Sequence, residues 1–191
     1  MNPAQKRDFK RPKFAQLNKE TSMDKKGVSE SAVATSQVMM PQDANPSGNV
    51  HGGVIMKLID TAAGVVATRH TRRNAVTASI DRLDFHHPAY VGNLLTLRAS
   101  INLVGRTSIE IGVRAETEDL LTGQIRHTGS AYLTFVALGS DGRPIEVPGL
   151  ILETEEEKRR NREACDRRDL RLAEKRKEKA HQGRAGETLT P

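Results

Sequence analysis

The sequence predicts an α+β fold in which one antiparallel sheet wraps around a single buried helix. Three observations support this prediction. Residues 53–68 are apolar on nearly every face, which is typical of a buried helix. Several later segments alternate apolar and polar residues, as strands with one face on a core do. Breaks that contain glycine separate those segments, as turns between antiparallel strands do.

Five segments are predicted as strands. Residues 95–103 and 109–116 show the clearest alternation, with aliphatic side chains on one face and polar residues or glycine on the other. Residues 76–85 and 126–138 also fit strands, and residues 33–40 fit a short first strand. The expected turns are residues 90–93, 104–106 and 121–123.

Composition limits the class of protein. The chain has 191 residues, of which 36% are hydrophobic and 28% charged, which fits one globular domain with extra polar sequence. No apolar stretch approaches the ~20 residues that a membrane-spanning helix needs. Residues 1–13 are basic and lack the apolar region of a secretory signal. Cys165 is the only cysteine and lies in a charged segment, so we expect a reducing compartment, namely the cytoplasm.

The formal net charge of +6 is distributed unevenly. Residues 1–31 hold eight basic and four acidic residues, residues 32–150 hold ten of each, and residues 151–191 hold twelve and ten. The neutral middle argues against a nucleic-acid-binding core, although weak, salt-sensitive contacts by the tails stay open. We interpret residues 1–31 as a disordered basic tail and residues 32–150 as the folded domain, because the latter hold nearly all the apolar residues.

A charged helix is expected after the folded domain. Residues 153–179 are dense in Glu, Lys and Arg, and opposite charges recur four residues apart. Such pairs support a helix whose faces are solvated. The pattern ends at Gln182, so we assign residues 151–181 to a charged helical extension and residues 182–191 to a disordered tail.

The segment 41–53 carries the strongest signal for a functional site. It is polar and rich in turn-forming residues, and it leads directly into the predicted helix. Gly52 and Gly53 would let a ligand approach the backbone closely, and the N–H groups at a helix start favour negative charge. This combination predicts an oxyanion site for a carbonyl group. An ordinary helix entry with glycines for steric reasons stays open.

Asp60 lies in the middle of the predicted helix, between Ile59 and the small apolar residues Ala62 and Ala63. Removing a carboxylate from water is costly unless other groups satisfy it. Asp60 is also outside the first turn, where the helix dipole would stabilise it. An acid in such a place is often functional. The alternative is a structural aspartate that is hydrogen-bonded at a subunit interface.

Several motifs occur in one register along the chain. The longest runs from Asn49 to Asp60 and contains both glycines and the mid-helix acid. The others are residues 40–45, 81–88, 104–108, 135–137, 142–144 and 147–148. Together they resemble the acyl-CoA hydrolase family that includes brain-type and bacterial short-chain acyl-CoA thioesterases. The resemblance covers roughly residues 38–150.

This resemblance implies the hotdog fold, a curved antiparallel sheet around one long central helix. It implies hydrolysis of acyl-CoA to a free fatty acid and CoA by a homodimer with two composite sites, commonly built into a trimer of dimers. Asp60 matches the catalytic helix carboxylate and Asn45 the catalytic loop amide, contributed by opposite subunits. Asp60 would act as general base or as nucleophile, which the sequence leaves open. Asn45 would orient water or the thioester, and the N–H groups of Gly52 and Gly53 would polarise its carbonyl.

The turn at Arg106, Thr107 and Ser108 is the predicted CoA-binding segment. In the resembled family this turn lies beside the pantetheine and nucleotide of CoA, where backbone groups and hydroxyls reach amide or phosphate oxygens. A plain hairpin turn with a solvated arginine is the alternative. His51 is expected to be a wall residue of the site, because the family reading gives it no required proton transfer.

No cofactor other than the CoA of the substrate, and no metal, is expected. His86 and His87 are neighbours at a strand end and therefore face opposite ways. No Cys/His cluster has the spacing of a zinc site.

Two other functions stay open for a domain of this fold. A non-catalytic module could bind acyl-CoA without cleaving it, and a thiol-release assay distinguishes it from a hydrolase. A dehydratase acting on hydroxyacyl thioesters would need an active-site histidine with an acid at different positions. The register of this chain favours Asp60 and Asn45 instead.

Overall fold

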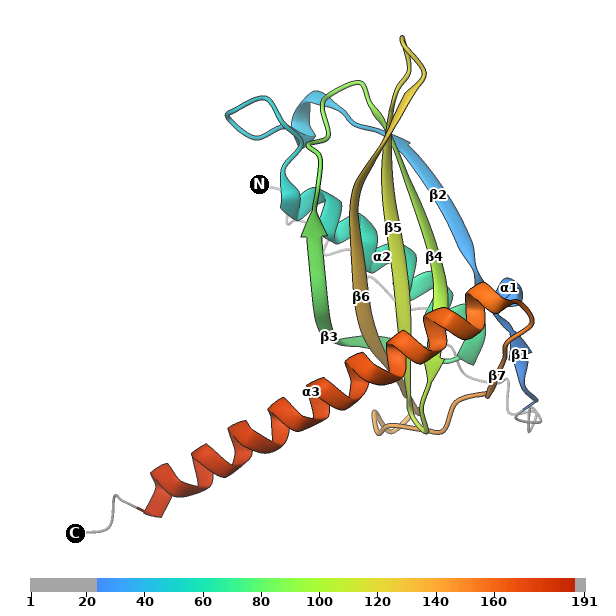
Figure 1. Ribbon diagram of the computed structural model, residues 1–191, viewed down its shortest axis with the longest axis vertical. Coiled ribbons are helices and arrows are strands. Elements are labelled where there is room, and N and C mark those ends of the chain that lie inside the picture. The colour runs from blue at the N-terminus through green and yellow to red at the C-terminus, as the bar shows by residue number, and fades with distance from the viewer. Residues whose placement is uncertain (1–23, 188–191) are drawn as a thin grey trace, which may run out of the picture.

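Residues 24–187, which the structure describes, fold around one five-stranded antiparallel sheet with a long helix on each face (Figure 1). The structure is a computed structural model, with side chains described as far as Glu178. The helices are α1 (Val28–Ser31), α2 (Gly52–Thr71) and α3 (Glu155–Glu187). The strands are β1 (Lys26–Gly27), β2 (Val33–Val38), β3 (Asn74–Phe85), β4 (Leu94–Val104), β5 (Ser108–Asp119), β6 (Gln124–Leu138) and β7 (Leu150–Ile151).

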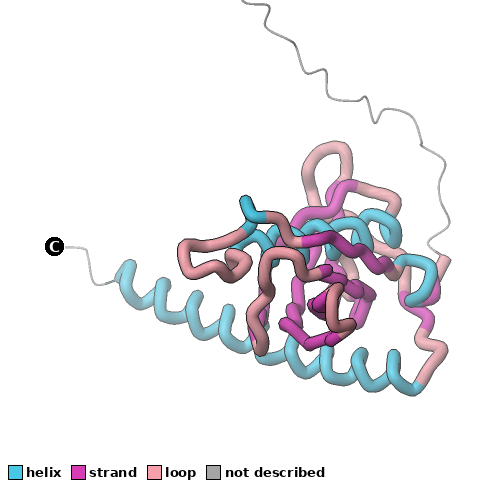
Figure 2. Tube along the Cα trace, turned by 90° about the horizontal axis from the view of Figure 1, so that it is seen from above, coloured by secondary structure: helices cyan, strands magenta, loops and turns pink. Residues whose placement is uncertain are grey.

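The strand order in the sheet is β2-β4-β5-β6-β3, and all neighbours are antiparallel. Helix α2 packs along one face and contacts every strand of this sheet. Helix α3 crosses the opposite face, so the strands lie between the two helices (Figures 1 and 2). The predicted architecture, one antiparallel sheet around a long helix followed by a charged C-terminal helix, is confirmed.

The core lies between α2 and the sheet. Ile59 and Val66 of α2 are fully buried there, because apolar residues recur three and four positions apart along the helix. The alternating residues of the strands complete the same cluster, with Leu95 on β4, Ile111 on β5 and Leu133 on β6. Burying each such side chain stabilises the fold by about 1.5–3 kcal/mol.

Helix α2 is not buried on all sides, so that prediction is wrong for a single chain. Met56 and Val65 are 41% and 39% exposed, although both are large and apolar. The buried residues of the helix face the sheet, and Met56 and Val65 lie on opposite sides of that buried stripe, because they are nine positions apart. The apolar residues around 53–68 therefore include side chains that one chain leaves exposed.

Helix α3 packs against the sheet through one of its faces, which corrects the prediction of solvated faces. Ala164 is fully buried, Arg167 is bonded to the buried Glu110 of β5, and Arg171 is bonded to Asp81 of β3. A buried carboxylate needs such partners, since an uncompensated one is costly. The helix also runs to Glu187, past Gln182, where the sequence predicts its end.

Residues 26–31 belong to the fold, so the predicted basic tail is too long. Strand β1 pairs in parallel with β7, which joins the N-terminal segment to the chain that precedes α3. Val28 and Ser31 of α1 are buried. The predictions for residues 1–23 and 188–191 lie outside the described residues. Within residues 24–187, no helix is both long and apolar enough to cross a membrane.

His70 joins three separate segments at the end of α2. It is fully buried, its Nδ1 lies 3.2 Å from Ser31 Oγ, and its Nε2 lies 2.9 Å from the carbonyl oxygen of Pro148. A neutral ring satisfies both contacts, with Nε2–H donating to Pro148 and Nδ1 accepting from the Ser31 hydroxyl. Burial lowers the pKa of His70 below its ordinary value of 6.5, and the nearby Lys26 lowers this pKa further, while the bond to Pro148 opposes the shift.

We expect the fold to lose stability below about pH 6.5, because the unfolded chain then binds a proton that the folded His70 does not. The loss from this residue is at most about 1.4 kcal/mol per pH unit and levels off below the folded-state pKa. Urea unfolding of the wild type and of His70→Gln at several pH values measures this loss of stability. The glutamine amide can still donate to Pro148. If the free energy of unfolding changes equally with pH in the two proteins, His70 is not the source of the loss.

Candidate active site

Asn45 organises the loop that leads into α2. Its backbone N–H donates to Asn49 O at 2.7 Å, and its side-chain Oδ1 accepts from the N–H groups of Ser47 and Asn49 at 2.9 and 3.2 Å. Because Oδ1 is held by two donors, the amide NH₂ is the end of the side chain that remains for a ligand. The side chain is half-buried.

Helix α2 begins with a hydrogen bond that changes the predicted oxyanion site. His51 is the N-cap residue, and its Nδ1 accepts from Gly53 N at 3.0 Å. The Gly53 N–H is therefore occupied in this arrangement, and Gly52 supplies the backbone N–H that remains at the helix start. A Cβ at Gly52 would lie 3.5 Å from the ring of Phe85, which places this helix start against the end of β3.

Asp60 is half-buried on the side of α2 that faces β3. Thr77 of β3 donates its hydroxyl hydrogen to Asp60 Oδ1 at 2.5 Å. The register of β3 against β6 shifts between Thr77 and Ser79, a bulge of the kind often found beside active sites. The hydrogen bond fixes the carboxylate and leaves Oδ2 as its available oxygen. A single chain leaves Asp60 half-buried and not fully removed from water.

Thr77 was not among the predicted site residues. It lies within a predicted strand, and its polar side chain gives no sign of its partner in the sequence. Only the packing of β3 against α2 brings it to Asp60.

One chain holds the predicted site in two separate halves. The first half contains Asn45 and Gly52, beside Phe85 at the end of β3. The second contains Asp60 and Thr77, near the start of β3. Gly52 and Asp60 are eight positions apart along the helix, which corresponds to about 12 Å. A reacting carbonyl needs an attacking group and an oxyanion donor each about 3 Å away, so this distance bears on whether one chain or two chains supply them.

The predicted CoA-binding turn lies at the Asp60 end of the sheet. Ser108 begins β5 and is aligned through Val136 of β6 with Val76 of β3, next to Thr77. The turn is closed by Gly105 N–H donating to Ser108 O at 2.7 Å. The Arg106 side chain is 82% exposed, with its guanidinium 4.0 Å from Glu146. The turn therefore lies at the same end of the sheet as Asp60, whereas Asn45 belongs to the half of the site at the other end of β3.

His86 and His87, after the end of β3, contact His127 of β6. His87 Nδ1 contacts the carbonyl oxygen of His127, and the rings of His86 and His127 are 4.9 Å apart. Among residues 24–178, whose side chains the structure describes, no group of three or more His, Cys, Asp or Glu side chains could hold a metal ion.

The chain is similar to known thioester hydrolases. Residues 47–136 match the family model described as the thioesterase superfamily. The chain is 38% identical over 151 residues to a Bacillus subtilis protein named "uncharacterized acyl-CoA thioester hydrolase YkhA", a match that covers 79% of this chain and 88% of the relative.

Solved structures of other proteins share the fold. An apo hexameric acyl-CoA thioesterase superposes with a TM-score of 0.77 at 36% identity, covering 79% of this chain and 97% of its own. The acyl-CoA hydrolase of Staphylococcus aureus, solved with butyryl-CoA, CoA and CoA disulfide, superposes with a TM-score of 0.77 at 32% identity, covering 84% and 98%. Structures of that enzyme also include alanine variants of one aspartate, one asparagine and one threonine.

The agreement between the fold, the family model and a relative matched over 88% of its length is decisive: this chain belongs to the hotdog-fold acyl-CoA thioester hydrolase family of the thioesterase superfamily.

Proposed function

We propose that this protein hydrolyses acyl-CoA thioesters to a free fatty acid and CoA, at a site that two chains complete together. The observation that carries the proposal is the separation of Asp60 and Thr77 from Asn45 and Gly52 within one chain. Each half has part of the required chemistry, and neither half has all of it. A second copy of the chain supplies what is missing.

Strand β3 is the edge at which a second copy would join. Within residues 24–187, β3 pairs on one side only, with β6, although it is 12 residues long. Val76 and Ile80 of this strand are 41% and 40% exposed. A long edge with exposed apolar residues favours pairing with another strand. The side of α2 that exposes Met56 would be covered by the same contact.

Antiparallel pairing of two β3 strands around a two-fold axis joins the halves. The start of one β3, with Thr77, then lies towards the end of the partner's β3, where the partner's Phe85 and Gly52 are. Asp60 of one chain approaches Asn45 of the partner, and the two-fold axis generates the arrangement twice. The similarity to a hexameric thioesterase supports a trimer of such dimers.

The proposed chemistry assigns each group a step. Oδ2 of Asp60 takes a proton from water as the water oxygen attacks the thioester carbonyl carbon. The amide of the partner's Asn45 orients the water or the thioester, and the partner's Gly52 N–H stabilises the negative charge on the carbonyl oxygen. The C–S bond then breaks, and the CoA thiolate takes up the proton from Asp60. In the alternative route, Oδ2 attacks the carbon itself and the C–S bond breaks, which releases the CoA thiolate and leaves an anhydride. Water then cleaves the anhydride to the free fatty acid and the Asp60 carboxylate, and the proton that is set free goes to the thiolate.

The variants of the Staphylococcus aureus hydrolase support these assignments. The substituted asparagine, aspartate and threonine of that enzyme have the same spacing along its chain as Asn45, Asp60 and Thr77 have here. The spacing adds Thr77 to the proposed site as the residue that positions Asp60. Arg106, Thr107 and Ser108 are proposed to contact CoA, because their turn lies at the Asp60 end of the sheet. We place the enzyme in the cytoplasm on the basis of its single cysteine.

A thiol-release assay on acyl-CoA substrates of increasing chain length tests the proposed function. We expect CoA release that saturates with substrate for at least one chain length, in the absence of added metal or cofactor. Tight binding of acyl-CoA without CoA release on any substrate would show a non-catalytic binding module instead. The panel also identifies the preferred acyl chain, which depends on the depth of the assembled site.

A further inference from the structure

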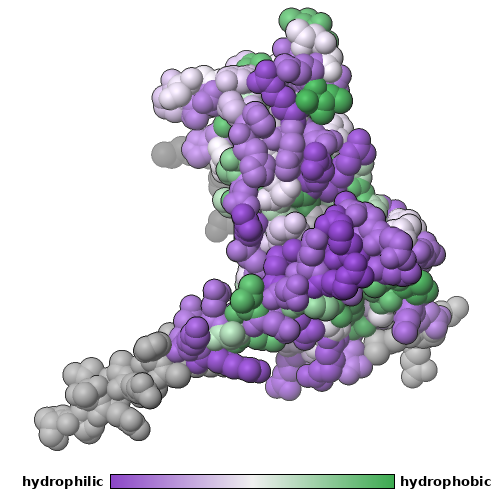
Figure 3. Space-filling view, in the orientation of Figure 1, coloured by the Kyte–Doolittle hydropathy of each residue, from purple (hydrophilic) through white to green (hydrophobic). Residues whose placement is uncertain are grey.

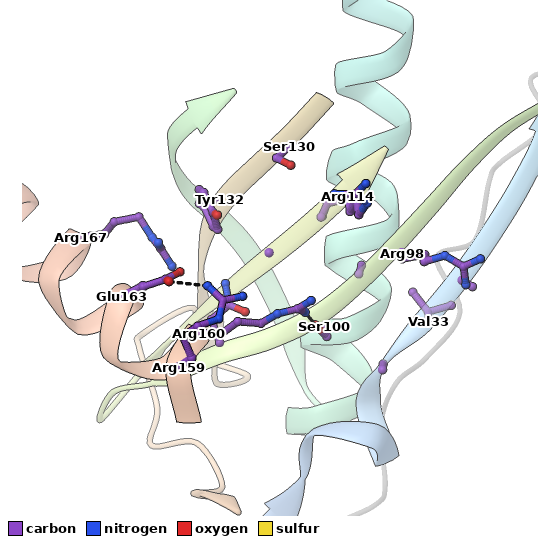
Figure 4. A pocket seen from close by; sticks show the side chains of 16 residues that line it. Val33, Arg98, Ser100, Arg114, Ser130, Tyr132, Arg159, Arg160, Glu163 and Arg167 are labelled. Atoms are coloured by element: carbon purple, nitrogen blue, oxygen red, sulfur yellow. Dashed lines mark hydrogen bonds and ion pairs between the residues drawn. The ribbon is translucent and has the colours of Figure 1, made fainter. Parts of the chain in front are cut away.

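Helix α3 crosses the outer face of the sheet and meets the strands in order. Arg160 donates to Ser100 of β4 at 3.4 Å, and Arg167 stacks on an aromatic ring of β6 (Figure 4). Arg171 is bonded to Asp81 of β3. The eleven positions from Arg160 to Arg171 span about 16 Å of helix, which matches the roughly 14 Å of three strand spacings from β4 to β3. Arg171 therefore stands over the edge strand.

The helix does not end at this edge. It runs on for 16 residues to Glu187, which corresponds to about 24 Å, and it leaves the sheet beyond β3 (Figures 1 and 2). Every side chain described in this part, from Leu172 to Glu178, is exposed. Most helices in proteins owe their stability to tertiary packing. The segment 172–187, here called the α3 arm, lacks this packing over its described side chains.

Two leucines mark the point at which α3 passes the edge of the sheet. The surface of α3 is mostly polar (Figure 3), yet Leu170 and Leu172 are 66% and 40% exposed. They flank Arg171, which faces the sheet, and successive helix residues are about 100° apart around the axis. The leucines therefore lie on the two sides of the helix, so a helix that approaches from either side meets one of them.

The arm carries both signs of charge close together. Glu174 and Glu178 enclose Lys175, Arg176 and Lys177, so this stretch has three bases between two acids. Two such helices that run antiparallel can place the acids of one against the bases of the other. A second copy of the same helix is thus a partner that suits this surface in charge.

The symmetry of the proposed dimer brings such a copy to the arm. The two-fold axis that relates two paired β3 strands stands perpendicular to the sheet, so both α3 helices lie on the same face, opposite α2. Asp81 is close to the middle of β3 (Asn74–Phe85), where the axis of a full-length pairing passes. Each α3 therefore crosses the seam near the axis, and a feature near a two-fold axis lies near its own copy.

We propose that the α3 arm is a contact surface for the α3 helix of the partner subunit. Each arm crosses the seam between the two β3 strands, lies over the partner's sheet and packs antiparallel against the partner's α3, with Leu170 and Leu172 at the centre of the contact. The inference rests on the dimer of the proposed function. It gives the charged helix a role, which is to hold the seam on the face opposite the two composite sites.

Cross-linking of the full-length protein tests where the arms lie. Cys165 is exposed on α3 and lies eight positions, about 12 Å, before Ala173. The variant Cys165→Ser/Ala173→Cys moves the single cysteine to the seam. A short bifunctional maleimide should convert most of this variant to linked dimers. It should link little of the wild type, because its two cysteines lie farther from the seam.

Charge placed at the seam tests what the contact contributes. Leu170→Glu/Leu172→Glu brings four like charges together where the two arms meet, and such juxtaposition weakens association. In sedimentation velocity across a dilution series, this variant should dissociate to single chains at a concentration at least about tenfold above that of the wild type. The control Leu120→Glu/Leu121→Glu makes the same changes at the exposed turn between β5 and β6 and should dissociate as the wild type does.

These outcomes separate the arm contact from the proposed hydrolysis, because neither measurement uses substrate. The arm contact is overturned if Cys165→Ser/Ala173→Cys links chains no better than the wild type, or if the leucine variant dissociates as its control does. A wild type that sediments as a single chain overturns both the arm contact and the composite site. A dimeric, active wild type whose arms do not cross-link overturns the arm contact alone.

Discussion

Replacing Asp60 by asparagine is expected to lower kcat for acyl-CoA hydrolysis by about 10²–10⁴-fold, the usual contribution of a positioned acid–base group. Asparagine has nearly the same shape, and its carbonyl oxygen can still accept the hydrogen bond from Thr77. It cannot accept a proton from water or attack the carbonyl carbon. The loss should therefore appear in kcat, while the Kd for acyl-CoA changes little.

The control is Asp141→Asn, which makes the same chemical change on a carboxylate that is 61% exposed, in the loop after β6. This variant should keep the wild-type kcat. Both variants should elute as the wild-type oligomer in size-exclusion chromatography and unfold at similar temperatures. If Asp60→Asn keeps near-normal kcat on every acyl-CoA hydrolysed by the wild type, Asp60 is not the catalytic carboxylate.

The strands that form the core could be predicted from the sequence because their pattern is local. Leu95, Leu97, Ala99 and Ile101 alternate with polar residues, and this alternation alone requires a strand with one buried face. The same argument locates β5. Helix α2 was predicted from its apolar content, but its exposed flank was not, since Met56 and Val65 look equally suited to a core or to an interface.

The elements that were predicted wrongly depend on contacts between distant parts of the chain. The order of residues 26–31 comes from pairing of β1 with β7, more than a hundred residues away. The packing of α3 depends on Arg167 reaching Glu110, which are 57 residues apart. In the sequence, Arg167 looks like one of many solvated charges in a polar helix. Nothing local distinguishes it from its neighbours.

Some features of the candidate site could likewise be predicted from the sequence, and others could not. Physical reasoning on the sequence identifies Asp60 as an unusual mid-helix acid, and the family resemblance adds Asn45. The role of Thr77 and the occupation of the Gly53 N–H by His51 are visible only in three dimensions. That opposite subunits contribute Asp60 and Asn45 is implied by the family resemblance, and the distance between the two halves within one chain supports it.

Mixing two inactive variants is expected to restore activity. In a mixed dimer of Asp60→Ala and Asn45→Ala chains, one of the two sites receives both substitutions and the other receives none. Random exchange makes half of the dimers mixed, so about a quarter of all sites should be intact. Mixing Asp60→Ala with Asp60→Asn gives no intact site and is the control.

The measurement that tests the central claim most directly is the rate of CoA release by an equimolar mixture of the Asp60→Ala and Asn45→Ala variants. Mass spectrometry first verifies that the subunits have exchanged. The composite site predicts a kcat per chain of about a quarter of the wild-type value, because isologous dimers carry two equivalent sites. A rate no higher than the mean of the two separate variants would place Asp60 and Asn45 in one chain's site, and would contradict the account.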